Sequence, residues 1–131
     1  MDRDRRARAR VSTSGQPTAA RSAAEVVSRF NAAWTAHDLA GALALISEDC
    51  VFESTAPPDG EHSTGPEAIA AAWRPIFDDP ASQFTVEQTI EAGHHVVQRW
   101  RYAWEGGHIR GVDLLTVTAG KITEKLSYVK G

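Results

Sequence analysis

The spacing of apolar residues changes after Asp79 and Pro80, and this change constrains the fold more than any other feature of the sequence. Ahead of it, apolar side chains recur every three or four residues, which is the period of an amphipathic helix. Beyond it, apolar side chains alternate with polar ones, which is typical of strands. Helices in the first part of a chain and hairpins in the second predict an α+β domain with helices packed on one face of a sheet.

Three helices and a short strand are expected ahead of the change. The first helix covers residues 23–36, and the second begins at Asp38, whose side chain can cap free backbone N–H groups. The apolar stripe of the second helix ends with Ile46. Residues 50–54 are expected to form the strand. The third helix begins at residues 64–67, which have the spacing of a capping box with a proline in the first turn.

Four longer strands are expected beyond the change, over residues 84–90, 96–104, 107–117 and 122–129. Glycines stand between strands at places where tight turns need them. The pattern therefore predicts a curved antiparallel meander. A curved sheet that is closed by helices on one face leaves a cone-shaped cavity, and we expect the functional site there.

One acid lies inside an otherwise apolar strand. Asp113 shares a strand face with Ile109 and Leu115, so its carboxyl group points where those side chains point. An ionised carboxylate is costly to bury without partners. It must therefore be paired, be kept protonated or line a wet cavity, and each option indicates a pocket. The alternative is an aspartate at a sheet edge or near a loop, whose side chain reaches water.

Composition and charge exclude several classes of function. The chain has 131 residues, which is enough for one domain. Residues 1–22 hold six arginines against two aspartates and few large apolar side chains, so we expect a disordered, solvated tail. Residues 23–131 carry eight basic and fifteen acidic side chains, a net charge of −7, which argues against binding to nucleic acid.

The sequence also gives no sign of a membrane, a metal or a cofactor. It has no apolar run long enough to span a bilayer and no histidine or cysteine spacing of a metal site. Cys50 is the only cysteine, so no internal disulfide can form, which favours a reducing cytoplasm. We expect Cys50 itself to pack as a small apolar residue.

The order of elements and several short motifs resemble a known family. The motifs are Trp34–Asp38, Ser47–Glu53, Thr64–Ile69 and Ala119–Glu124, together with Tyr128. Over residues 23–131 the chain resembles the nuclear transport factor 2-like superfamily, of the SnoaL-like and ketosteroid-isomerase-like kind. The resemblance implies a cone-shaped α+β fold in which three N-terminal helices pack on a curved, mostly antiparallel sheet. It also implies a mostly apolar pocket, often a homodimer through the outer face of the sheet, and activities that range from isomerase, cyclase and hydrolase to none.

The match to ketosteroid isomerase at the site is incomplete. Asp113 matches the protonated acid of the oxyanion hole in that enzyme. The position of the oxyanion tyrosine falls on Phe30, which has no hydroxyl group. The position of the general-base aspartate falls on or beside Ser54, with Glu53 one residue earlier. The resemblance therefore does not favour steroid isomerisation itself.

Together these arguments give a candidate site with Asp113 and Glu53 as the catalytic residues. The residues expected to bind the ligand are Phe30, Trp34, Ser54, His62, Trp73, Trp100, Tyr102, Trp104, Leu115 and Lys125. Lys125 is the expected charge partner of Asp113, and His62 is a candidate proton shuttle. Plainer alternatives stay open: the tryptophans can be core residues, Lys125 an exposed lysine, and Glu53 a solvated residue or an arginine's ion-pair partner.

The leading hypothesis is an isomerase or cyclase that binds a small apolar organic molecule and uses Asp113 for proton transfer. The alternatives are a ligand-binding module without catalysis and a dimeric interaction module of the same fold. Whether the chain is an enzyme therefore stays open. A second proton-transfer group close to Asp113 would distinguish the enzyme from the binding module.

Overall fold

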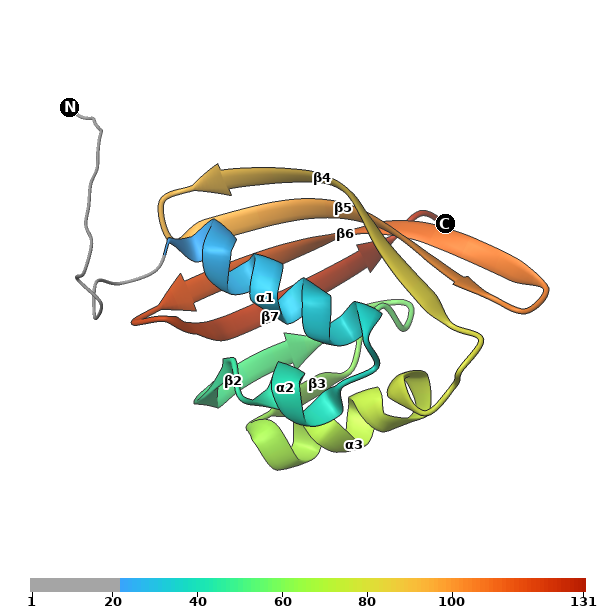
Figure 1. Ribbon diagram of the computed structural model, residues 1–131, viewed down its shortest axis with the longest axis horizontal. Coiled ribbons are helices and arrows are strands. Elements are labelled where there is room, and N and C mark those ends of the chain that lie inside the picture. The colour runs from blue at the N-terminus through green and yellow to red at the C-terminus, as the bar shows by residue number, and fades with distance from the viewer. Residues whose placement is uncertain (1–21) are drawn as a thin grey trace.

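The computed structural model describes residues 22–131 (Figure 1). The tail expected over residues 1–22 lies outside this range except for Ser22. The helices are α1 (Ala23–Thr35), α2 (Leu39–Leu43) and α3 (Pro66–Phe77). The strands are β2 (Ile46–Glu53), β3 (His62–Thr64), β4 (Gln83–Ala92), β5 (His95–Trp104), β6 (Gly107–Thr118) and β7 (Lys121–Val129).

The strands form one six-stranded sheet in the order β3-β2-β7-β6-β5-β4. Neighbouring strands are antiparallel except β2 and β7, which run parallel. The helices lie on one side of the curved sheet (Figure 1). The expected α+β fold, with three helices on a curved and mostly antiparallel sheet, is confirmed. No helix in residues 22–131 is long and apolar enough to cross a membrane.

The boundary between α2 and β2 differs from the prediction. The helix ends at Leu43, and Ile46, which was expected to finish its apolar stripe, is the first residue of β2. Ile46 is buried opposite Ile122 of β7, whose backbone N–H donates to the carbonyl of Leu45 at 2.8 Å. A short apolar run is compatible with the spacing of a helix and with that of a strand, and here the pairing with β7 selects the strand. The strand therefore begins at Ile46 rather than at residue 50.

The capping box expected at the start of α3 does not form. Thr64 is the last residue of β3, so Gly65 stands at the N-cap, with a φ of 89° that favours glycine. Pro66 occupies the first turn of the helix as expected. A capping box forms instead at α1, where Ser22 and Glu25 each accept a hydrogen bond from the other's backbone N–H.

Aromatic side chains hold the helices together above the sheet. Phe30 and Trp34 of α1 pack against Trp73 and Phe77 of α3, with ring centroids 4.6 to 6.4 Å apart within this cluster. Most of the pairs are tilted or edge-to-face, which are arrangements that aromatic rings prefer. Burial of each ring stabilises the fold by roughly 1.5–3 kcal/mol. The cluster therefore fixes α1 over the sheet, where it forms one wall of the site.

The register of the sheet brings three polar side chains into one row. Gln98 of β5 lies opposite Asp113 of β6, and Asp113 lies opposite Ser127 of β7. All three side chains are buried on the face that the helices cover. Successive residues of a strand point to opposite faces, so a slip of one residue would turn Asp113 to the outer face. The row thus depends on this register.

Candidate functional site

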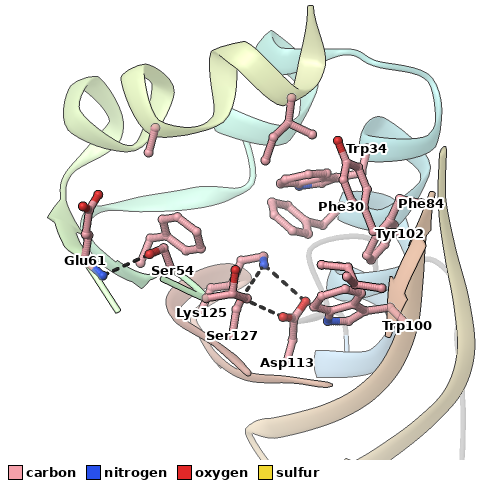
Figure 2. A pocket seen from close by; sticks show the side chains of 15 residues that line it. Phe30, Trp34, Ser54, Glu61, Phe84, Trp100, Tyr102, Asp113, Lys125 and Ser127 are labelled. Carbon is pink, nitrogen blue, oxygen red and sulfur yellow. Dashed lines mark hydrogen bonds and ion pairs between the residues drawn. The ribbon is translucent and has the colours of Figure 1, made fainter. Parts of the chain in front are cut away.

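A cavity of about 280 Å³ lies between the helices and the covered face of the sheet (Figure 2). Aromatic and aliphatic side chains form most of its wall, and a few polar groups converge on one part of it. The lining residues are Phe30, Trp34, Phe52, Ser54, Thr55, Glu61, Ala72, Ile76, Phe84, Trp100, Tyr102, Ile109, Asp113, Lys125 and Ser127. This combination is the usual form of a site for a small organic molecule.

Asp113 is fully buried, and both of its carboxylate oxygens accept hydrogen bonds. The Ser127 hydroxyl donates to Oδ1 at 2.7 Å, and Lys125 Nζ lies 3.2 Å from Oδ2. Gln98 Nε2 donates to Oδ2 as well, at 3.3 Å. All three neighbours are donors, so the carboxyl group of Asp113 is fully paired. Of the three options for a buried acid, the structure shows pairing.

The orientation of Gln98 is fixed by a second amide. Asn31 of α1 donates from Nδ2 to Gln98 Oε1 at 2.8 Å, and Gln98 Nε2 lies 3.2 Å from Asn31 Oδ1. In this reciprocal pair the Gln98 carbonyl accepts from Asn31, and the Gln98 NH₂ group donates one hydrogen to Asn31 and the other to Asp113. The helix therefore helps to determine which group the carboxylate meets.

Lys125 is buried, so the alternative of an exposed strand lysine is wrong. Its side chain is 9% exposed, and Nζ donates to the Ser127 hydroxyl at 2.9 Å besides pairing with Asp113. Nζ also lies 5.5 Å from the ring centroid of Trp34 and 5.2 Å from that of Phe52. The ammonium group therefore has an ion pair on one side and aromatic faces on the other (Figure 2).

Glu53 is not brought together with Asp113 in the lining of the cavity. It pairs across the β2–β3 ladder with His62, whose Nε2 lies 2.7 Å from Glu53 Oε2, and the side chain of His62 is 62% exposed. Neither residue is among those that line the cavity. Their neighbours Ser54 and Glu61 line it instead, and the Ser54 hydroxyl accepts the backbone N–H of Glu61 at 3.0 Å. Strand alternation turns Glu53 and Ser54 to different sides.

The predicted aromatic residues divide into two groups. Phe30, Trp34, Trp100 and Tyr102 line the cavity. Trp73 and Leu115 are almost completely buried in the core and do not line the cavity. Trp104 shares a strand face with Trp100 but does not line the cavity. It stands at the end of β5, is 40% exposed and lies against Gly107 beyond the turn.

Sequence reasoning missed Gln98 and Asn31. The sequence did contain a signal for Gln98. It stands two residues before Trp100 in β5, so the two side chains lie on the same, covered face of the sheet. Asn31 carried none, since a polar residue on a helix usually faces water. Ser127 lies two residues after Lys125 and therefore on the same strand face, and the structure adds its two hydrogen bonds.

Cys50 packs in the core as expected. Burial, and secondly the negative charge of Asp49, raise the pKa of its thiol to about 11. The nucleophilic form of cysteine is the thiolate, so this residue is unsuited to nucleophilic chemistry at neutral pH.

Comparisons with known proteins agree on the fold. A family model described as a SnoaL-like domain matches residues 27–125. An NTF2-like protein of unknown function from Mesorhizobium loti is 41% identical, with a TM-score of 0.77 over 83% of this chain and 91% of that chain. An NTF2-like protein of unknown function from Cytophaga hutchinsonii is 19% identical, with a TM-score of 0.70 over 82% and 89%.

A further solved structure carries a bound small molecule. It is a hypothetical protein with a ketosteroid isomerase-like fold from Catenulispora acidiphila, in complex with trimethylamine. It is 25% identical, with a TM-score of 0.67 over 79% of this chain and 84% of that chain. No curated protein matches the chain.

Proposed function

The chain belongs to the SnoaL-like domain family, and from this premise we propose that it binds a small, largely apolar organic molecule and transfers a proton on it through Asp113 and Lys125. One observation carries the proposal: a buried ion pair lies against an otherwise apolar cavity. Taking two charges out of water is expensive, and the cost is easier to explain where the charges act on a bound molecule. The fold alone does not choose a reaction.

The size of the cavity limits the ligand. At about 280 Å³ the cavity lies just below the range of sites for drug-sized molecules. We therefore propose a ligand with a single ring or a short branched skeleton. The relative from Catenulispora acidiphila, crystallised with trimethylamine, supports a ligand of small size.

The chemistry follows from the order of the polar groups. Lys125 Nζ can donate a proton to an oxygen of the ligand, and the Asp113 carboxylate, 3.2 Å from Nζ, can take up a proton from a neighbouring carbon of the ligand. Isomerisation and cyclisation both need this kind of proton movement. The proposal rests on Asp113 rather than on Glu53, because Glu53 is paired with His62 outside the cavity lining.

A ligand-binding module without catalysis is the second candidate. It is favoured by the hydrogen bonding of Asp113, whose two oxygens already accept from three donors. A carboxylate satisfied in this way can orient Lys125 toward a ligand without ever taking up a proton.

We also propose a homodimer in the cytoplasm, formed through the outer face of the sheet. Ile90, Val97, Leu114 and Leu126 lie opposite one another in a single row across β4, β5, β6 and β7. Ile90 is 52% exposed and Leu114 is 39% exposed, which is unusual for a continuous apolar row on a monomer. Light scattering should give twice the protomer mass, and Leu114→Asp should halve it.

Proton exchange on a simple ketone tests the main proposal without a known substrate. Acetophenone fits the size limit, and its methyl protons exchange with D₂O only through an enol. We expect the wild-type protein to accelerate this exchange, followed by NMR, and to show saturable quenching of Trp34 and Trp100 fluorescence. Asp113→Asn should still fold, at reduced stability because Lys125 loses its anion, but should lose the acceleration. Glu105→Gln, the same change at an exposed acid in the β5–β6 turn, is the matched control.

The outcomes distinguish the two candidates. Saturable binding with accelerated exchange that depends on Asp113 supports an enzyme. Saturable binding with exchange at the rate of buffer alone favours the binding module. Absence of binding to a panel of small ketones and aldehydes would contradict both.

A further inference from the structure

We propose that Lys125 forms a covalent imine with a small aldehyde or ketone held in the cavity. The inference rests on the proposed function, because the carbonyl compound has to enter the same cavity. It goes further, since it names a substrate class and assigns to Lys125 a nucleophilic role.

Lys125 differs from the other lysines of the chain. The sequence has three, and Lys121 and Lys130 are exposed whereas Lys125 is buried. Its amino group ends at the cavity, between the faces of Trp34 and Phe52. A lysine that is removed from water beside a carbonyl group is the arrangement that favours Schiff-base chemistry.

The polar groups around the cavity favour a ligand with an acceptor oxygen. The Asp113 oxygens and the Ser127 hydroxyl already form hydrogen bonds within the protein. The nearest group that can bond to a ligand is therefore a donor, the remaining N–H of Lys125. The indole N–H groups of Trp34 and Trp100, both from lining residues, are buried without an acceptor among residues 22–131. Residues 23–131 carry a net charge of −7, which favours a neutral carbonyl compound over a carboxylate.

The reaction balances within the site. Lys125 Nζ gives one proton to Asp113 Oδ2, and the free amine then attacks the carbonyl carbon. A C–N bond forms, and a second proton passes from the nitrogen to the carbonyl oxygen, which becomes a hydroxyl group. Asp113 returns its proton to this hydroxyl, the C–O bond breaks, and water leaves. The products are a protonated imine and the Asp113 carboxylate. Lys125 thus loses two hydrogens to the departing water, and no oxidant or reductant is needed.

The charge of the site is the same before and after the reaction. Asp113 faces an ammonium group at the start and a protonated imine at the end, so the buried carboxylate keeps a positive partner. The partner residues Gln98 and Ser127, which hold both carboxylate oxygens, need not move. The ion pair therefore stabilises the covalent product as well as the free lysine.

Reductive trapping with benzaldehyde tests this proposal. Benzaldehyde has no α-hydrogens, so the result is independent of any proton exchange on the ligand. The full-length protein is treated with limiting benzaldehyde and sodium cyanoborohydride, and the labelled lysines are identified by peptide mass mapping. A trapped imine adds the mass of benzaldehyde less one oxygen atom. We expect labelling of Lys125 to exceed that of Lys121 and Lys130 by about tenfold or more, because binding raises the local concentration of the aldehyde.

Two comparisons make the result decisive. Methyl benzoate, which has the same ring and a carbonyl group but forms no imine, should compete with the labelling of Lys125 and leave Lys121 unchanged. Lys125→Arg keeps a positive charge for Asp113. Benzaldehyde should still quench the tryptophan fluorescence of this variant, but its β7 peptide should carry no label beyond that of Lys121.

The possible failures are distinct. Labelling confined to Lys121, Lys130 or the N-terminal amine, together with saturable quenching by benzaldehyde, overturns the imine and leaves the proposed function intact. The absence of both quenching and selective labelling overturns the two proposals together. Selective labelling of Lys125 that methyl benzoate does not reduce would also contradict the imine site, since the aldehyde would then react from outside the cavity.

Discussion

Lys125→Met tests the energetics on which the description of the site depends. Methionine keeps most of the apolar length of the side chain but removes the charge, so Asp113 becomes a buried carboxylate without its cation. Breaking a buried ion pair in this way costs about 3–5 kcal/mol. Because Ser127 and Gln98 still donate to Asp113, we expect the lower end of this range. For a domain of this size, about 3 kcal/mol lowers Tm by roughly 12 °C or more.

The double variant Lys125→Met/Asp113→Leu separates the loss of the pair from the loss of packing. With both charges removed, no carboxylate is left alone in the core, so the double variant should recover about 1–2 kcal/mol relative to Lys125→Met. The recovery is incomplete because Ser127 and Gln98 lose their acceptor. Urea unfolding followed by tryptophan fluorescence measures each free energy, and Lys130→Met is the control at an exposed lysine.

Two results would refute this reasoning. If Lys125→Met were no less stable than Lys130→Met, the charge of Asp113 would not be buried in solution. If the effects of Lys125→Met and Asp113→Leu simply added, the two side chains would not be energetically coupled.

Further predictions concern other parts of the molecule. Gly111→Ala places a Cβ against the backbone carbonyl oxygen of Tyr128 and the ring of Trp100, so it should cost about 1–3 kcal/mol in urea unfolding. Unchanged stability would contradict the close packing there. The Cys50 thiol, with its pKa raised to about 11, should react with a thiol reagent only on unfolding, and rapid labelling of the folded protein would show that it is accessible. A hydrogen bond from Arg110 holds the pKa of Glu87 below its ordinary value, so the ion pair stabilises the fold above that ordinary pKa and the gain is lost as pH falls through the lowered one. The difference in Tm between wild type and Glu87→Gln should therefore shrink on acidification, and a constant difference would mean that the ion pair is not its source.

Much of the fold was predictable because the spacing of apolar residues and the residue types at the turns indicate the same elements along most of the chain. The three helices, the strands after Pro80 and the covered face of β6 follow from local patterns. The prediction was wrong at Ile46 and Thr64, and in both places a strand pairing with a distant segment overrides the local signal. Local patterns contain no information about such pairings, so the early strands were the least predictable part.

The candidate site was predictable only in part, for a similar reason. Asp113 was identified because a charged residue on an apolar strand face stands out in the sequence. Lys125 was identified because the alternation of side chains along the neighbouring strand can turn it to the same face. Which aromatic side chains reach the cavity depends on how the sheet curves, so Trp73 and Trp104 could not be separated from Trp34 and Trp100. The role of Gln98 depends on an amide supplied by α1, which pattern alone does not place.

The parallel pairing of β2 with β7 has a consequence for the order of folding. Asp113 and Lys125 belong to adjacent strands of one hairpin and can meet early, while both are still in water. Phe52, which lies beside Lys125 on β2, and Trp34 on α1 come from the distant first half of the chain. We therefore expect the hairpin to form first, and the pair to lose its water only in a later step in which the helical half docks. Changes to this pair are then expected to alter the rate of that docking step, so the two side chains proposed to act in the cavity are also expected to influence how quickly the cavity forms.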